Sequence, residues 1–200
     1  MDNLLNVCMG LGLSAACGFR VFVPLLAMNL AAQSGEISLT PEMEWIGTTP
    51  ATIAFGVATA VEVLAYYVPV VDNLLDTIEV PAAMIAGTVV TAAVVPDMDP
   101  TLRWIFAVIA GGGAAETIEL ATSATRLVST AATGGMANSV VSTVEVGSAL
   151  TLSLLTLAIP ALAAIVVGVL IVWGGKKIYK HFFKRNRNQT EDLSETMHDE

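Results

Sequence analysis

Residues 147–174 form a long run without a single charged side chain. About 20 consecutive apolar residues are enough to cross the hydrocarbon core of a bilayer. The whole chain has the same character, with 54% hydrophobic and only 14% charged residues and a mean hydropathy of +0.71. Soluble domains carry about one-quarter charged residues. We therefore expect an integral membrane protein, with the lipid bilayer as its main partner.

Prolines, glycines and polar turns divide the sequence into segments with helical spacing. We expect an all-α, polytopic transmembrane helix bundle with five or six membrane-embedded helices. The expected helices cover about 4–32, 50–68, 72–95, 101–132 and 138–184. The last segment would be about 70 Å long, too long for one straight crossing of a core about 30 Å thick. It either bends at Pro160 or consists of two segments, so the count stays open between five and six.

The C-terminal region has a different composition from the rest of the chain. We expect residues 1–185 to form the transmembrane helical bundle domain and residues 186–200 a disordered polar tail. Six of the nine Lys and Arg residues lie between Lys176 and Arg187, directly after the last apolar run. Basic residues beside a span mark the cytoplasmic side. We therefore place the protein in the cell (inner) membrane with a cytoplasmic C-terminus.

Nine charged side chains lie within or beside the apolar segments. Each would cost about 2.5–3.5 kcal/mol at the centre of a bilayer. They must therefore face the bundle interior, lie near an interface, pair with each other or be neutral. These residues are Arg20, Glu62, Asp72, Asp76, Glu79, Glu116, Glu119, Arg126 and Glu145.

Most of these charges lie on one face of their helix, together with other polar residues. Residues separated by three or four positions share a helix face. The polar stripes consist of Thr59, Glu62 and Tyr66 on the second helix, Asp72, Asp76 and Glu79 on the third, Glu116, Glu119 and Arg126 on the fourth, and Ser142 and Glu145 on the last. We expect the stripes to converge on a common centre.

Two functions are compatible with such a centre. The nine charged residues can form a site for an ion or small solute, which would make the protein a small transporter or channel. Alternatively, the charges only fix helix packing in a non-transporting scaffold or partner-binding protein. The acids outnumber the bases by seven to two, and helix packing alone requires no such surplus. The sequence therefore favours the transporter or channel.

Signs of enzymatic chemistry are weak. The only histidines, His181 and His198, lie in the C-terminal region, which argues against a His-based metal site or a Ser-His triad. Glu116 and Glu119 could offer oxygen ligands to a hard cation, and whether a metal binds is left open. We expect no enzyme, no cofactor and no nucleic-acid partner. Because a bundle of 200 residues is small, we expect a homo-oligomer.

Two segments of the chain resemble each other. Residues 72–83 align without gaps to residues 138–149, with Glu79 matching Glu145. Duplicated halves are common in transporters. Internal duplication and chance resemblance between two apolar helices both stay open.

Several blocks of the sequence resemble an uncharacterised membrane-protein family known as domain of unknown function 4126. The blocks are SAACGFRVFVPLL at 14–26, EVLAYYVP at 62–69 with Asp72 and Asp76 after it, STAATGG at 129–135 and NSVVSTVE at 138–145. Together they extend over about residues 5–170. The chain departs from the pattern at Tyr66, where the family often has Asp, and at Ser139 and Val146.

The resemblance implies a membrane protein of several helices and no particular activity. The residues that match the family's motif positions are Arg20, Glu62, Asp72, Asp76 and Glu145, which also belong to the charged set chosen above.

Overall fold

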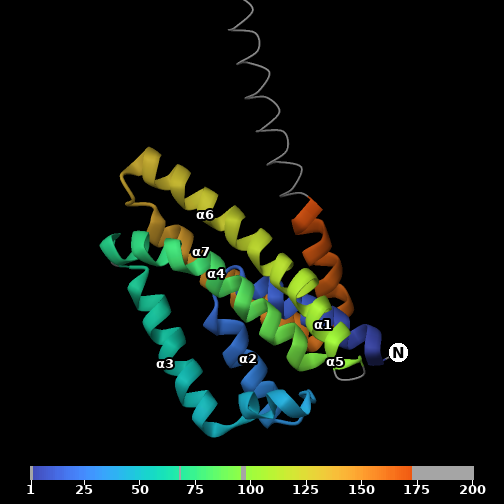
Figure 1. The fold of residues 1–200 in the computed structure, drawn as a ribbon. Coiled ribbons are helices and arrows are strands. Elements are labelled where there is room, and N and C mark those ends of the chain that lie inside the picture. The colour runs from blue at the N-terminus through green and yellow to red at the C-terminus, as the bar shows by residue number, and fades with distance from the viewer. Residues whose placement is uncertain (1, 68, 96–97, 173–200) are drawn as a thin grey trace, which may run out of the picture.

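The computed structural model describes residues 2–67, 69–95 and 98–172 and is helical over most of them (Figure 1). Its α-helices are α1 (Asp2–Cys17), α2 (Phe22–Gln33), α3 (Thr49–Ala65), α4 (Pro69–Val94), α5 (Pro100–Phe106), α6 (Gly113–Thr133), α7 (Asn138–Ala158) and a further helix, Pro160–Val172. A 3-10 helix, η1 (Pro41–Gly47), precedes α3, and a π-helical segment, η2 (Ala107–Gly112), joins α5 to α6. No strand occurs among these residues, which confirms the all-α class.

The continuous first helix expected over about 4–32 is wrong. Helix α1 ends at Cys17 and α2 begins at Phe22. At the break, a side chain on Gly18 would overlap α6, since an added Cβ would lie 2.7 Å from Cβ of Ile118. The break carries a single charged residue, Arg20, between two apolar helices, and this one residue did not distinguish a helix break from a buried charge within a continuous helix.

The next two helices agree with the sequence-based boundaries. Helix α3 covers Thr49–Ala65, and α4 begins at Pro69, the residue expected to end the preceding helix. Proline is well suited to the first turn of a helix because it has no N–H to leave unpaired.

The helix that contains the three consecutive glycines at 111–113 is irregular at that point and packs closely against α4. The helix runs through η2, whose π-helical turn is typical of a local irregularity. At Gly87 on α4, an added Cβ would lie 2.8 Å from the carbonyl oxygen of Gly111. The two backbones therefore approach more closely than any larger residue would allow.

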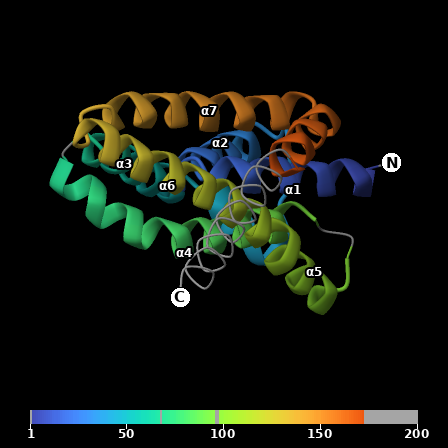
Figure 2. The same cartoon turned by 90° about the horizontal axis from the view of Figure 1, so that it is seen from above.

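The long C-terminal helical stretch consists of two segments, the second of the two alternatives. Helix α7 ends at Ala158, and Ile159 leaves the helical region with φ −142° and ψ 76°. A new helix starts at Pro160 and folds back beside α7 (Figure 2). The basic cluster and the polar tail 186–200 lie outside the described residues.

Helix α1 lies at the centre of the bundle, between α4 and α7 (Figure 2), and also contacts α6. One apolar core joins α1 and α2 to α4, η1 and α3, with Leu13, Met28 and Val90 fully buried. A second, smaller core joins α1, α6 and α7 to the last helix through Ala163 and Val167. The residues between these cores are charged.

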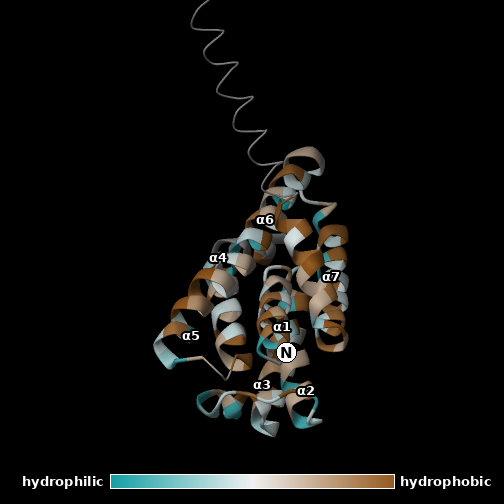
Figure 3. Ribbon diagram, turned by 90° about the vertical axis from the view of Figure 1, so that its right-hand side faces the viewer, coloured by the Kyte–Doolittle hydropathy of each residue, from teal (hydrophilic) through white to brown (hydrophobic). Residues whose placement is uncertain are grey.

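The outer surface of the bundle is apolar. Large apolar side chains are exposed along α3 and α7, and hydrophobic residues recur along the helices in Figure 3. Exposed apolar surface on this scale marks a membrane or protein contact, and the apolar helices indicate a membrane-embedded protein.

The expected count of five or six spans is not confirmed by the described helices. Two described helices are long and apolar enough to cross a membrane, Pro100–Thr133 and Asn138–Ala158. A third span results if η1 and α3, which meet at 64°, are counted as one bent crossing. The remaining apolar helices are shorter, so the structure supports two or three candidate spans, and the count of five or six stays a prediction.

Candidate functional site

Five buried residues from five parts of the chain meet at the centre of the bundle, and we call them the ion cluster. They are Arg20 in the break between α1 and α2, Tyr66 at the end of α3, Glu79 on α4, Arg126 on α6 and Glu145 on α7. Each is at most 6% exposed. Four of the nine charged residues chosen from the sequence, Arg20, Glu79, Arg126 and Glu145, therefore meet at one point, together with Tyr66.

Glu145 is the most strongly bound member of the ion cluster. Its Oε1 accepts a hydrogen bond of 3.0 Å from Nε of Arg126, and its Oε2 accepts a second from Nη2 of the same guanidinium. Nη2 of Arg20 donates to the same Oε2 at 2.8 Å. Two-pronged arginine–carboxylate pairs of this kind are among the stronger hydrogen-bonded contacts in proteins. Glu145 thus holds both arginines.

Arg20 is also bound to a second acid on another helix. Its Nη1 lies 3.5 Å from Oε1 of Glu79, too far and too poorly oriented for a hydrogen bond. Glu79 and Glu145, which align in the sequence repeat, therefore contact the same guanidinium from α4 and α7. The contact to Glu79 is the looser of the two.

Tyr66 is the cluster member that the sequence analysis placed on a polar stripe without assigning it to the site. The guanidinium carbons of Arg20 and Arg126 lie 3.7 and 4.0 Å from its ring centroid, and its hydroxyl donates to Oε2 of Glu79. An aromatic face attracts a cation, more strongly when water is excluded. Its position one helical turn after Glu62 was the signal that could have identified it.

Glu62 binds backbone rather than a cation. Its two carboxylate oxygens accept from the backbone N–H groups of Val21 and Phe22, at 2.7 and 3.2 Å. These groups stand at the start of α2, where unpaired N–H groups and the helix dipole favour a negative charge. Glu62 therefore stabilises the break that positions Arg20.

Glu119 lies on α6 at 1% exposure. It accepts a hydrogen bond of 2.8 Å from the hydroxyl of Ser123 and a longer one of 3.4 Å from Thr122. Glu116, one turn earlier, is half-buried and forms no ion pair with a described residue. The side chains of Asp72 and Asp76 lie outside the described ones, so their place in the predicted site is untested.

The central charges are not balanced. Four buried glutamates (Glu62, Glu79, Glu119 and Glu145) are accompanied by two buried arginines, Arg20 and Arg126, since the third buried arginine among the described residues, Arg103, pairs with Glu42 instead. Removing charges from water is costly unless they are paired and hydrogen-bonded. Nε of Arg20 has no hydrogen-bond partner among the described atoms. The centre therefore holds excess acid and an unused donor.

A small pocket between α6 and α7 reaches the ion cluster. Its volume is about 280 Å³, and Glu145 is part of its wall. Three hydroxyl side chains, those of Thr122, Thr125 and Ser148, lie along it with apolar residues. The pocket therefore adjoins the residue that binds both arginines, although the side chain of Glu145 is only 4% exposed.

The described acids do not form an evident metal site. No three or more His, Cys, Asp or Glu side chains within 2–67, 69–95 and 98–172 are grouped so that they could hold a metal ion. Glu116 and Glu119 therefore lack a third described ligand of this kind.

A family model matches residues 7–178, and the family is described as a domain of unknown function (DUF4126). The chain belongs to this family. The match confirms the resemblance found from the sequence blocks and covers every member of the ion cluster. No curated protein matches the chain, and no solved structure matches it either. Membership of DUF4126 gives the ion cluster no known activity, so its function has to be argued from its geometry.

Proposed function

We propose that the protein is a small transporter or channel in which an ion or small solute interacts with the ion cluster. The observation that carries this proposal is the helix break at residues 18–21, which holds Arg20 between Glu79 on α4 and Glu145 on α7. Broken helices whose ends face a polar site are a recurring feature of transporters. Non-helical backbone at membrane depth is tolerated where protein buries it or a cavity adjoins it.

The geometry suggests how the ion cluster would respond to a cation. Glu145 is held by two guanidiniums, whereas Glu79 shares only the looser contact with Arg20. A proton or cation that neutralises Glu79 would leave Arg20 bound to Glu145 alone. Because these acids lie on different helices, this change would loosen α1 from α4 and leave its contact with α7 intact. The buried glutamates outnumber the two central arginines, so carboxylates are present that such a cation could bind.

The proposed membrane, orientation and oligomeric state are based on the sequence. We place the protein in the inner membrane of the cell with its C-terminus in the cytoplasm, because Lys and Arg cluster after the last apolar run. We also propose a homo-oligomer, because one chain of 200 residues offers few helices to surround a pathway. An enzymatic role and a cofactor form no part of the proposal.

A second function is favoured by one specific observation. Both arginines are paired, and the contact of Arg126 with Glu145 is two-pronged. If both arginines stay paired in this way, the role of the ion cluster is to fix the relative positions of α1, α6 and α7. The protein would then be a membrane scaffold or partner-binding protein without transport.

Flux measurements on purified protein in liposomes separate the two functions. We expect wild-type protein to conduct protons or small monovalent cations, and Glu79→Gln and Glu119→Gln to reduce the flux at least tenfold. Glu44→Gln, an exposed change outside the ion cluster, is the control and should conduct normally. Absence of flux from wild type, together with neutral variants at least as stable as wild type, would establish the scaffold.

A further inference from the structure

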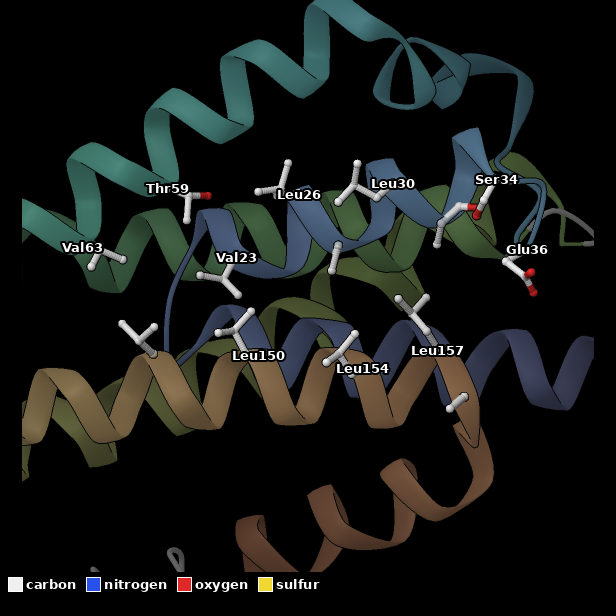
Figure 4. Close-up of a pocket in the computed structure, with 14 residues that line it drawn as sticks. Val23, Leu26, Leu30, Ser34, Glu36, Thr59, Val63, Leu150, Leu154 and Leu157 are labelled. Atoms are coloured by element: carbon white, nitrogen blue, oxygen red, sulfur yellow. The ribbon is translucent and has the colours of Figure 1, made fainter.

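A long apolar groove lies between α2, α3 and α7, on the side of α7 away from the last helix (Figure 4). Its volume is about 730 Å³, within the range of small-molecule sites. Its walls include Val23, Leu26 and Leu30 on α2 and Leu150 and Leu154 on α7. Helix α3 leans away from α7 and leaves the groove open (Figure 4).

The length of the groove matches one leaflet of a bilayer. Its wall on α2 extends from Val23 to Ser34. At 1.5 Å per residue this distance is about 16 Å, roughly half of a hydrocarbon core about 30 Å thick. Half of the core is the depth that a single lipid acyl chain occupies.

The two ends of the groove differ in polarity. Ser34 and Glu36 lie at one end, where α2 gives way to an exposed loop, while Thr59 and Val63 lie at the other (Figure 4). Val63 directly follows Glu62, so this end lies near the helix break. It carries no charge among the described residues, and its one hydroxyl, Oγ1 of Thr59, is buried without a described hydrogen-bond partner. The charged end thus suits a headgroup and the uncharged end a terminal methyl group.

We propose that the groove binds one acyl chain of a phospholipid whose headgroup carries an ammonium group, such as a phosphatidylethanolamine. The acyl chain lies along α2 and α7, and the ammonium group lies beside Glu36. Among the described residues that line the groove, Glu36 alone is charged, so its carboxylate complements a cationic group and repels a purely anionic headgroup. This inference does not depend on the proposed transport activity.

The test uses the purified full chain, stripped of lipid in detergent and then supplied with defined lipids. Native mass spectrometry counts the phospholipids retained per chain. We expect wild type to retain one phosphatidylethanolamine. Leu154→Trp, which fills the groove, should lower retention at least tenfold. Leu127→Trp is the matched control, because Leu127 is 71% exposed on α6 and does not line the groove.

The headgroup is tested separately by competition between phosphatidylethanolamine and phosphatidylglycerol of the same acyl chains. We expect wild type to prefer the former by about twofold to fivefold, the range of an exposed ion pair. Glu36→Gln should abolish the preference, and Glu44→Gln should keep it. A preference that survives Glu36→Gln would overturn the headgroup assignment.

Two results would overturn the acyl-chain site itself. One is equal lipid retention by wild type and Leu154→Trp. The other is a lipid-free dimer of wild type that Leu154→Trp converts to a monomer, which would assign the groove to a second copy of the chain.

Discussion

Helix α1 is held against α4 in two different ways along its length. In its C-terminal half, Ser14 Oγ donates to the carbonyl of Gly87 at 2.7 Å, and Thr91 Oγ1 donates to the carbonyl of Gly10 at 3.2 Å. This contact, which we call the small-residue contact, also includes Gly111, whose backbone lies against Gly87. Beyond the C-terminal end of α1, the ion cluster joins the same helices through Arg20 and Glu79.

The difference shows what packing alone requires. Small residues and hydroxyl groups let helix backbones approach and hydrogen-bond in an apolar environment. The small-residue contact achieves this without any charge. The ion cluster joins the same two helices with charges that are costly to bury. We therefore propose that the acids of the ion cluster take part in transport and do not serve packing alone. The following variants test this proposal.

The largest effect on stability is expected from Arg126→Ala. The change leaves Glu145 with only Arg20 as a described cationic partner, and removal of one member of a buried ion pair costs about 3–5 kcal/mol. The free energy of unfolding, measured by denaturant titration in mixed micelles, should fall by this amount. A loss below about 1 kcal/mol would mean that the ion cluster is wetter and less tightly coupled than its geometry indicates.

Gly111→Ala should have an intermediate effect and act only on the small-residue contact. An added Cβ would lie 2.7 Å from the carbonyl oxygen of Gly87, and overpacking of this kind costs about 1–3 kcal/mol. Gly113→Ala is the control, because nothing lies within 4 Å of its added Cβ. Thermal unfolding of both variants gives the comparison. Equal stability of the two would refute close packing at Gly111.

Tyr66→Phe should lower the stability less than Arg126→Ala or Gly111→Ala does. Its main effect should be on the flux. The ring and its contact with both guanidiniums stay, but Glu79 loses the hydroxyl donor, at a cost of about 0.5–1.5 kcal/mol. If Glu79 exchanges a proton or cation, the flux through liposomes should change severalfold at equal protein content. Unaltered flux in an active wild-type protein would remove Tyr66 from the transport site.

The smallest net effect on stability is expected from the double variant Arg126→Met, Glu145→Leu. Replacement of a buried ion pair by apolar residues of similar size is often neutral or stabilising. Glu145→Leu also removes the hydrogen bond of Arg20 to Glu145 and leaves Arg20 only its looser contact with Glu79, which offsets the gain from this replacement. We expect the free energy of unfolding of this variant to lie within about 1 kcal/mol of the wild-type value. The flux through liposomes should be lost completely. A stable double variant that transports like wild type would exclude Arg126 and Glu145 from the pathway.

Much of the site could be predicted from the sequence because helical spacing is local. Glu62 and Tyr66 lie four positions apart and Glu119 and Arg126 seven apart, so it could be predicted without knowledge of the fold that each pair shares a helix face. The helix break could not be predicted in this way. It is stabilised by Glu62, which lies 41 residues after Val21 in the chain, and no local pattern reports such a distant partner.

The span count and the role of Tyr66 could not be predicted from the sequence for the same reason, because both depend on contacts between distant parts of the chain. Hydropathy detects apolar segments, but whether each crosses the membrane depends on breaks such as the one near Arg20 and the one at Ile159. The sequence showed Tyr66 on a polar face, yet only the fold brings two guanidiniums over its ring.

The position of Glu145 has a consequence for biosynthesis. Arg20 emerges from the ribosome early, and its main carboxylate partner follows 125 residues later. Until then Arg20 lacks its hydrogen bond to Glu145. The junction of α1 and α2 gains its contact with Glu62 first and its contact with α7 only later. The N-terminal helices can therefore complete their assembly only when synthesis of the chain has passed Glu145.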